Sequence, residues 1–289
     1  MRSPAYDPPM PRAAVNGIEL EYDTFGSAAD PTIVVISGLG GQSPTNFYDA
    51  FCELLAGKGY HVVRFDNRDN GLSSMVEAGG YSLSDMALDT VALLDFLGVG
   101  AAHVVGLSMG GMIAQTMAIE HPARVLTLTS IMSTTGAPGV GGPTEAGASR
   151  LMVAAGDSRE ERIASAVETC RVWWGDSPEF PFDIELAEWR SALAVDRANT
   201  PDGTVRQFLA IRASGDRTEK LRELRVPTVV IHGTNDSLIQ MSGGEATAAA
   251  IPGAELVLIE GMGHGLAKKA WPRIIETIDR LAARAAAVS

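Results

Sequence analysis

The sequence has little cysteine, few aromatic residues, a deficit of positive charge and no long hydrophobic run. Only two cysteines, Cys52 and Cys170, occur among 289 residues, and their spacing fits neither a CxxC motif nor a zinc site. We therefore expect two buried, free thiols and no disulfide framework. No segment approaches the roughly 20 apolar residues of a membrane-spanning helix. No metal or organic cofactor is indicated.

Acidic residues outnumber basic ones by 35 to 23, which gives a formal net charge of -12. Proteins that bind nucleic acid or anionic membranes generally present a basic face, so neither partner is expected. The charge leaves an apolar or weakly charged small molecule as the expected partner. The first residues contain no apolar run of signal-peptide length, and we expect a cytoplasmic location. The oligomeric state cannot be predicted from the sequence.

Short apolar runs alternate with helical patterns, as in a mostly parallel sheet covered by helices on both faces. Alternation of apolar and polar residues places the first strand at a sheet edge. A capping box from Ser82 to Asp85 opens a helix whose predicted apolar face is Leu88, Val91, Leu94 and Leu97. The predicted strands are 17–25, 32–36, 60–65, 103–105, 125–131, 227–232 and 255–259, and other predicted helices are 46–57, 112–120, 243–251 and one from about 271.

Between residues 134 and 225 helical patterns recur without buried strand runs. Three of the four tryptophans, Trp173, Trp174 and Trp189, lie in this segment and suit the lining of an apolar cleft. We therefore predict one domain with a core of residues 1–133 and 226–289 and an inserted helical cap of residues 134–225. The alternative is ordinary helical elaboration of the core.

The motif G-x-S-x-G occupies Gly106 to Gly110, between a predicted strand and a predicted helix. This is the context of a nucleophile elbow, in which a sharp turn exposes the central serine above the sheet. Ser108 is therefore the candidate nucleophile. The alternative is a glycine-rich helix start with Ser108 as its N-cap.

A nucleophilic serine needs a base to accept its proton and an acid to orient that base. Among five histidines, His264 alone lies in a glycine-flanked loop after the final strand. Asp236 follows the preceding strand, which gives the chain order Ser, Asp, His. Asp236 alone also fits an Asx-turn or a helix N-cap. His232 is expected to support the acid loop.

Two backbone N–H groups are predicted to form an oxyanion hole. One belongs to Met109, directly after the serine, and the other to Leu39 in the glycine-rich loop after the second predicted strand. The alternative interpretation of this segment as a dinucleotide-binding loop is excluded, because Ser43 occupies the position of the third glycine of G-x-G-x-x-G.

From about residue 14 onward the chain resembles the α/β-hydrolase family, and more narrowly bacterial carboxylesterases related to aclacinomycin methylesterase. The matching segments are 37–40, 66–73, 106–110, 232–236 and 263–264. The resemblance implies a mostly parallel eight-stranded sheet flanked by helices, with a cap after the sixth strand. Ser37 departs from the family, where many members have histidine. Asp66, Arg68 and Asp69 are expected to brace their loop, although Arg68 could instead bind a substrate carboxylate.

These features together predict a serine hydrolase that cleaves carboxylic esters through an acyl-enzyme. Lactonase, C–C bond hydrolase and perhydrolase activities use the same three residues and stay open. A serine nucleophile argues against haloalkane dehalogenases and epoxide hydrolases, which use aspartate. A non-catalytic binding protein and a cofactor-independent oxygenase are the alternatives from other classes.

Overall fold

An eight-stranded sheet forms the centre of the computed structural model, which describes residues 10–287 except 152, 154–155 and 199. The strand order is β1-β2-β4-β3-β5-β6-β7-β8. β1 pairs antiparallel with β2 and β2 with β4, and all later neighbours pair in parallel. The predicted α/β-hydrolase sheet is confirmed. The strands are β1 (Arg12–Val15), β2 (Ile18–Phe25), β3 (Thr32–Ile36), β4 (His61–Phe65), β5 (Ala102–Leu107), β6 (Val125–Ile131), β7 (Thr228–Gly233) and β8 (Glu255–Ile259).

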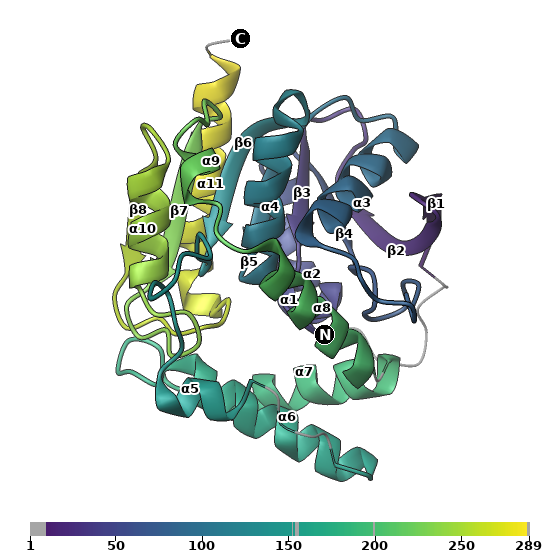
Figure 1. The fold of residues 1–289 in the computed structure, drawn as a ribbon, viewed down its shortest axis with the longest axis vertical. Helices are drawn as coiled ribbons and strands as arrows, with labels where there is room; N and C mark the ends of the chain where they lie inside the picture. The colour runs from purple at the N-terminus through teal and green to yellow at the C-terminus, as the bar shows by residue number, and fades with distance from the viewer. Residues whose placement is uncertain (1–9, 152, 154–155, 199, 288–289) are drawn as a thin grey trace.

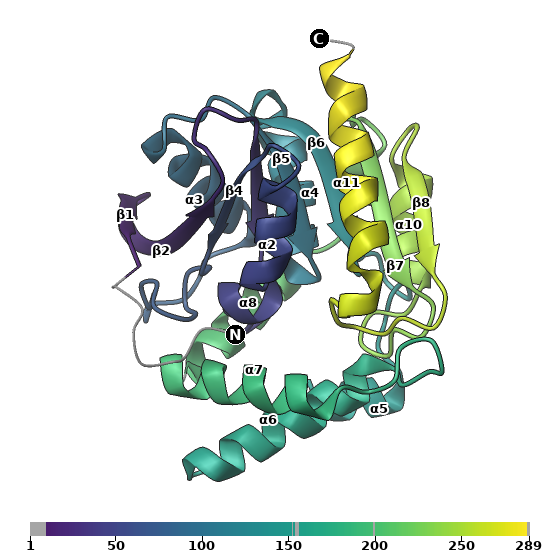
Figure 2. The ribbon, with the colours of Figure 1, turned by 180° about the vertical axis from the view of Figure 1, so that it is seen from behind.

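Helices cover both faces of the sheet (Figures 1 and 2). Every residue of the inner strands β3 and β5 is buried, which explains their unbroken apolar character. One face carries α2 (Asp49–Ala56) and α11 (Trp271–Ala286), and the other carries α3 (Leu83–Phe96), α4 (Met109–Glu120) and α10 (Ser242–Ala250). The short helix α1 (Ser43–Asn46) precedes α2.

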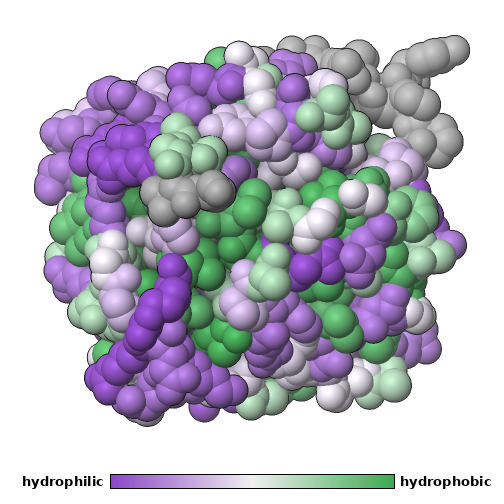
Figure 3. Space-filling model, turned by 90° about the horizontal axis from the view of Figure 1, so that it is seen from above, coloured by the Kyte–Doolittle hydropathy of each residue, from purple (hydrophilic) through white to green (hydrophobic). Residues whose placement is uncertain are grey.

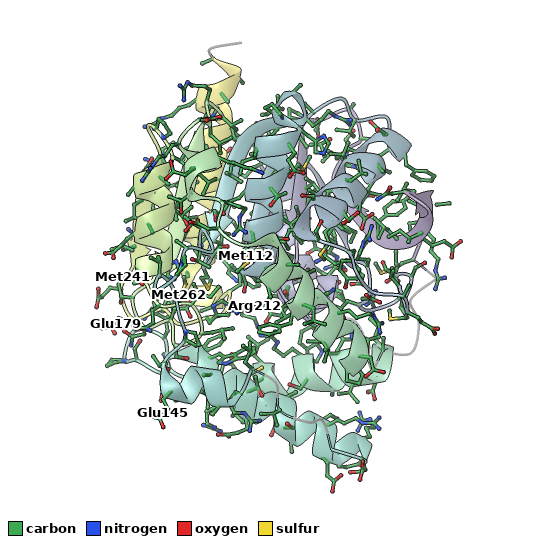
Figure 4. All side chains as sticks on the ribbon, viewed as in Figure 1. Met112, Glu145, Glu179, Arg212, Met241 and Met262 are labelled. Carbon is green, nitrogen blue, oxygen red and sulfur yellow. The ribbon has the colours of Figure 1, made fainter. Side chains whose placement is uncertain are left out.

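The segment after β6 crosses the carboxyl ends of the strands, at the foot of Figure 1. Its helices are α5 (Glu145–Ser149), α6 (Arg159–Trp174), α7 (Ile184–Arg197), α8 (Pro201–Ser214) and α9 (Thr218–Leu221). We refer to α5 through α8 as the cap helices. Figure 4 shows Glu145 pointing from α5 away from the sheet. α8 returns to pack against α3, and α9 packs against α4 and α10. The division into core and inserted cap by residue number stays a prediction.

The end of the molecule away from α5, α6 and α7 shows hydrophilic residues around smaller hydrophobic patches (Figure 3). All the parallel strands begin toward this end, so the loops that carry chemistry lie at the other end. Within the described residues, no helix is both long enough and apolar enough to cross a membrane.

Four details differ from the sequence prediction. β1 was not predicted, because it has only four residues and follows a proline-rich segment. β1 forms the edge of the sheet, so β2 is not the edge strand. The helix predicted over 46–57 is two helices, interrupted at Phe47 and Tyr48. Leu88 is 40% exposed, so it does not belong to the buried face of α3. That face is instead formed by Met86, Ala87, Thr90, Val91, Leu93 and Leu94.

Candidate active site

Ser108 lies at a strained turn between β5 and α4. Its φ of 57° is positive, a conformation that costs a non-glycine residue free energy and often marks a functional site. The turn needs glycine on both sides. A Cβ on Gly106 would overlap the carbonyl of Gly110, and a Cβ on Gly110 would overlap the carbonyl of Ile36. The Ser108 amide donates to the carbonyl of Ile131 at 2.8 Å, which ties the turn to β6.

The structure brings Ser108, His264 and Asp236 into one hydrogen-bonded chain. Nε2 of His264 lies 3.0 Å from Oγ of Ser108, and Nδ1 lies 2.7 Å from Oδ2 of Asp236. An ionised carboxylate only accepts, so Nδ1 carries the ring hydrogen and Nε2 accepts from the serine hydroxyl. Ser108 is 7% exposed and Asp236 4%. This arrangement can take a proton from Ser108 and stabilise the resulting imidazolium.

Asp236 uses its two oxygens for different contacts. Oδ1 accepts from the amides of Leu238 at 2.9 Å and Ile239 at 2.8 Å, an Asx-type turn that leaves Oδ2 for His264. Nε2 of His232 donates to the carbonyl of Ile239 at 2.8 Å. Burial lowers the pKa of His232, so the ring stays neutral near pH 7. His232 therefore braces the turn that orients the carboxylate.

The end of α6 contacts the loops of both His264 and Asp236. The His264 amide donates to the carbonyl of Trp173 at 2.7 Å, and the two rings meet edge to face with centroids 6.2 Å apart. Beside Asp236, Oγ of Ser237 donates to the carbonyl of Val172 at 2.8 Å. A cap helix therefore fixes the loops that follow β7 and β8.

The 37–42 loop after β3 passes next to Ser108. Its amide at Gly38 donates to Oδ1 of Asn46 at 2.9 Å, and its amide at Gly41 donates to the carbonyl of Gly38 at 3.1 Å. The amide of Gly40 donates to Oε1 of Gln207 on α8 at 3.0 Å. Three amides of this loop, those of Gly38, Gly40 and Gly41, are thus already paired with acceptors.

Leu39 lies between these paired amides. In the described part of the chain its own N–H has no acceptor, and neither has that of Met109 at the start of α4, where helix geometry leaves the N–H groups unpaired. A Cβ on Gly38 would lie 3.2 Å from Cβ of Ser108, which shows how near the loop comes. The hydroxyl of Ser37 is buried without a partner among the described residues. Ser37, which stands where many family members have histidine, therefore does not brace the loop through its side chain. Asn46 and Gln207 bind the amides of the loop instead.

The 66–74 loop is braced by ion pairs. The guanidinium of Arg68 contacts both carboxylate oxygens of Asp89 at 2.6 Å, and both residues are buried. Asp69 accepts from Arg206 of α8 at 2.7 and 2.9 Å. Asp66 is fully buried beside Arg197 of α7, at 2.6 Å. Arg68 is paired with Asp89 and is not among the residues that line the cavity, so the structure favours the bracing role over binding of a substrate carboxylate.

A cavity of about 550 Å³ lies between the cap helices and the hydrogen-bonded chain. Ser108 and His264 open into it. Trp173 and Trp174 line it, whereas Trp189 packs against Tyr48 with ring centroids 6.0 Å apart. The lining mixes apolar residues with three arginines and one aspartate, Asp202. The arginines are Arg150, Arg162 and Arg190.

The two cysteines are both free, as predicted, but they differ in burial. Cys52 is buried, and burial raises the pKa of its thiol to about 12. Cys170 is only partly buried and lines the cavity, so the prediction of two buried thiols is wrong for this residue. It lies on the cavity side of α6 rather than in the core.

Comparison with known proteins identifies the family. A family model for the alpha/beta hydrolase fold matches residues 31–268. The chain therefore belongs to the α/β-hydrolase family. It is 31% identical over 270 residues to rhodomycin D methylesterase of Streptomyces sp. (strain C5), covering 86% of this chain and 90% of that protein. The predicted resemblance to this group of bacterial esterases is confirmed.

Other relatives have different substrates in their names. A 2-hydroxy-6-oxononadienedioate/2-hydroxy-6-oxononatrienedioate hydrolase of Pseudomonas putida is 30% identical over 252 residues, covering 86% of this chain and 85% of that one. The solved enol-lactonase of Burkholderia xenovorans LB400 superposes with a TM-score of 0.73 at 25% identity, covering 96% and 100% of the two chains. A meta-cleavage product hydrolase of Pseudomonas fluorescens IP01, at 20% identity, shares the fold with a TM-score of 0.81 over 95% of this chain and 98% of that one. The relatives thus support a hydrolase and leave its substrate class open.

Three residues near the site were missed by the sequence analysis. Asn46 and Gln207 bind amides of the 37–42 loop, and Arg197 reaches the 66–74 loop. Arg197 lies 131 positions from Asp66, and Gln207 lies 167 positions from Gly40. No local sequence motif marks either residue. Asn46 is eight positions from Gly38, but its helix was predicted without that contact.

Proposed function

We propose that this protein hydrolyses carboxylic esters of small molecules through an acyl-enzyme formed on Ser108. The observation that carries this proposal is the continuous hydrogen-bonded chain from Asp236 through His264 to Ser108 at the floor of a cavity. In this role His264 is the general base and acid, Asp236 orients it, and the amides of Leu39 and Met109 hold the oxyanion. No metal or organic cofactor takes part in this mechanism.

The proposed reaction has two halves. Oγ of Ser108 attacks the ester carbonyl while Nε2 of His264 takes its proton, and the carbonyl oxygen becomes an oxyanion between the two amides. Collapse of this intermediate breaks the bond to the alcohol, which leaves with the proton from His264. A water molecule then attacks the acyl-enzyme with the same base, and the carboxylic acid and free Ser108 are regenerated.

Ester hydrolysis is favoured over the related reactions by the rhodomycin D methylesterases, which are 30–31% identical over most of both chains. The 30% identity to the Pseudomonas putida hydrolase makes C–C bond hydrolysis the second candidate. We expect the ester substrate to be apolar or weakly charged. The cytoplasmic location stays a prediction.

The test is hydrolysis of p-nitrophenyl esters from acetate to decanoate by the wild type and by Ser108→Ala. A monoester of a dicarboxylic acid, added to the series, tests the effect of charge in a cavity lined by three arginines. We expect turnover by the wild type and a loss of at least about a thousandfold in Ser108→Ala. Ser149→Ala, on the exposed side of α5, is the matched control and should keep full activity.

Failure of the wild type to turn over any ester, together with no labelling by a fluorophosphonate, would refute the proposal. Labelling without ester turnover would move the C–C bond hydrolase to first place, and a 2-hydroxy-6-oxo-dienoate substrate would then test that reaction directly.

A further inference from the structure

Gln207 is a fully buried amide side chain on α8, and both ends of the amide bind backbone groups of the core. Oε1 accepts from the amide of Gly40 at 3.0 Å, and Nε2 donates to the carbonyl of Arg68 at 2.7 Å. One end accepts and the other donates, so the orientation of the amide is fixed by its partners. One side chain of the cap helices therefore joins the 37–42 loop to the 66–74 loop.

Gln207 contacts the 37–42 loop at Gly40, where the backbone conformation and the close approach of α8 leave little room for change. Gly40 has a φ of +61°, and a Cβ there would lie 2.9 Å from Oγ1 of Thr204, so α8 lies directly on this residue. Oδ1 of Asn46 fixes the amide of Gly38 from the core side. Leu39 lies between the two fixed amides, and its own N–H has no acceptor among the described residues.

We propose that Gln207 is a positioning residue for the reaction: by holding the amide of Gly40 it fixes the direction in which the Leu39 N–H points. The inference rests on the proposed ester hydrolysis. An oxyanion donor contributes only when it lies at hydrogen-bond distance from the developing charge, and loss of one donor costs about 100- to 1000-fold in kcat. Gln207 lies outside the hydrogen-bonded chain of Ser108, His264 and Asp236. It thus affects the rate of oxyanion formation through the position of the Leu39 N–H.

The matched pair Gln207→Met and Arg206→Met tests this. Gln207→Met keeps the length of the side chain and removes both hydrogen bonds. Arg206→Met loosens the same helix by removing its ion pair with Asp69, without touching the 37–42 loop. Gln207→Glu keeps an acceptor for the Gly40 amide and a polar group at the buried position. For each variant kcat, KM and the inhibition constant of an alkyl boronic acid, which forms a tetrahedral adduct with serine, are measured with p-nitrophenyl acetate.

For Gln207→Met we expect kcat to fall about 10- to 100-fold, a partial loss of one donor, while KM changes less than about threefold. Boronic acid affinity should fall in parallel with kcat/KM, because both report the tetrahedral state. Gln207→Glu should lose less than Gln207→Met, and Arg206→Met should keep kcat within about threefold. A purely structural role would not separate kcat from KM in this way.

Wild-type kcat in Gln207→Met, or equal losses in Gln207→Met and Arg206→Met, would overturn the positioning role while leaving ester hydrolysis intact. An inactive wild type that also resists fluorophosphonate would instead refute the proposed function, and this inference would fail with it. Should Gln207→Met not fold, Gln207→Asn takes its place, because its amide is one methylene too short to reach Gly40. A wild-type kcat in Gln207→Asn with unchanged boronic acid affinity would then count against the role.

Discussion

The core loops and the cap helices are held by different kinds of contact. In the core, backbone hydrogen bonds fix the site: the Ser108 amide binds the carbonyl of Ile131, and the amides of Leu238 and Ile239 bind Asp236. The cap helices share apolar contacts with the core and are also attached through long polar side chains. Arg197 of α7 pairs with Glu21 and Asp66, both almost fully buried.

This difference indicates that the core loops are fixed by contacts that tolerate few substitutions, whereas the contacts of the cap helices can vary in sequence. Backbone contacts depend on glycine and strand geometry, which tolerate few substitutions. Side-chain ion pairs can be exchanged without changing the sheet, and burial makes each of them sensitive to loss of one partner. We therefore expect changes at the hydrogen-bonded chain of the core to remove activity, and changes in the buried ion pairs of the cap helices to reduce stability.

The largest effect is expected from Asp236→Asn. The amide would disfavour the tautomer of His264 that accepts the serine proton, and kcat should fall about 10³- to 10⁴-fold with folding intact. Steady-state kinetics and circular dichroism check both parts. Asp216→Asn, at an exposed aspartate outside the cavity lining, is the control and should behave as the wild type. Near-normal activity of Asp236→Asn would refute its role as the orienting acid.

Arg197→Met tests the cap side of the comparison. It leaves the carboxylates of Glu21 and Asp66 buried without their cation, and removal of one partner from a buried ion pair costs about 3–5 kcal/mol. Urea denaturation should show this loss. Arg159→Met, which breaks an exposed pair with Asp196, should leave the urea midpoint unchanged. Equal midpoints for the two variants would contradict the claim that buried pairs hold the cap.

The smallest expected effect is a pH dependence carried by Glu21. Burial, with a hydrogen bond to Asp66, raises its pKa to about 7 against the opposing charge of Arg197. The folded state thus holds the proton more tightly than the unfolded state, so stability is lost as pH rises from about 4.5 through 7. Between pH 5 and pH 8 the wild type should lose on the order of 2–3 kcal/mol more than Glu21→Gln. Identical pH profiles would show that Glu21 titrates normally.

The core could be predicted from the sequence because its signals are local. The apolar runs 32–36, 125–131 and 255–259 coincide with β3, β6 and β8 residue for residue. The glycines around Ser108 and His264 predict tight turns. In the structure, a Cβ at Gly106, Gly110 or Gly263 would overlap a backbone carbonyl. Parallel strands bring their carboxyl ends to one edge, so residues after β5, β7 and β8 could be expected to meet.

The cap contacts could not be predicted, because each joins residues far apart in sequence through side chains common on any protein surface. Gln207 and Arg206 are adjacent on one helical turn, yet one binds Gly40 and the other Asp69. β1 has only four residues and lies beside prolines, so its alternation was too short to recognise. Its helical spacing predicts Leu88 on the buried face, but the side chain is 40% exposed.

The acyl-enzyme is the most direct test of the central claim, that Ser108 is the nucleophile of an ester hydrolase. Rapid mixing with excess p-nitrophenyl acetate, acid quenching and mass spectrometry of the digested protein would locate the acyl group. The account predicts an acetyl group on the peptide that contains Ser108, formed within one turnover and absent in Ser108→Ala. Ester turnover by the wild type with no adduct on Ser108, or with the adduct on Cys170, would contradict it.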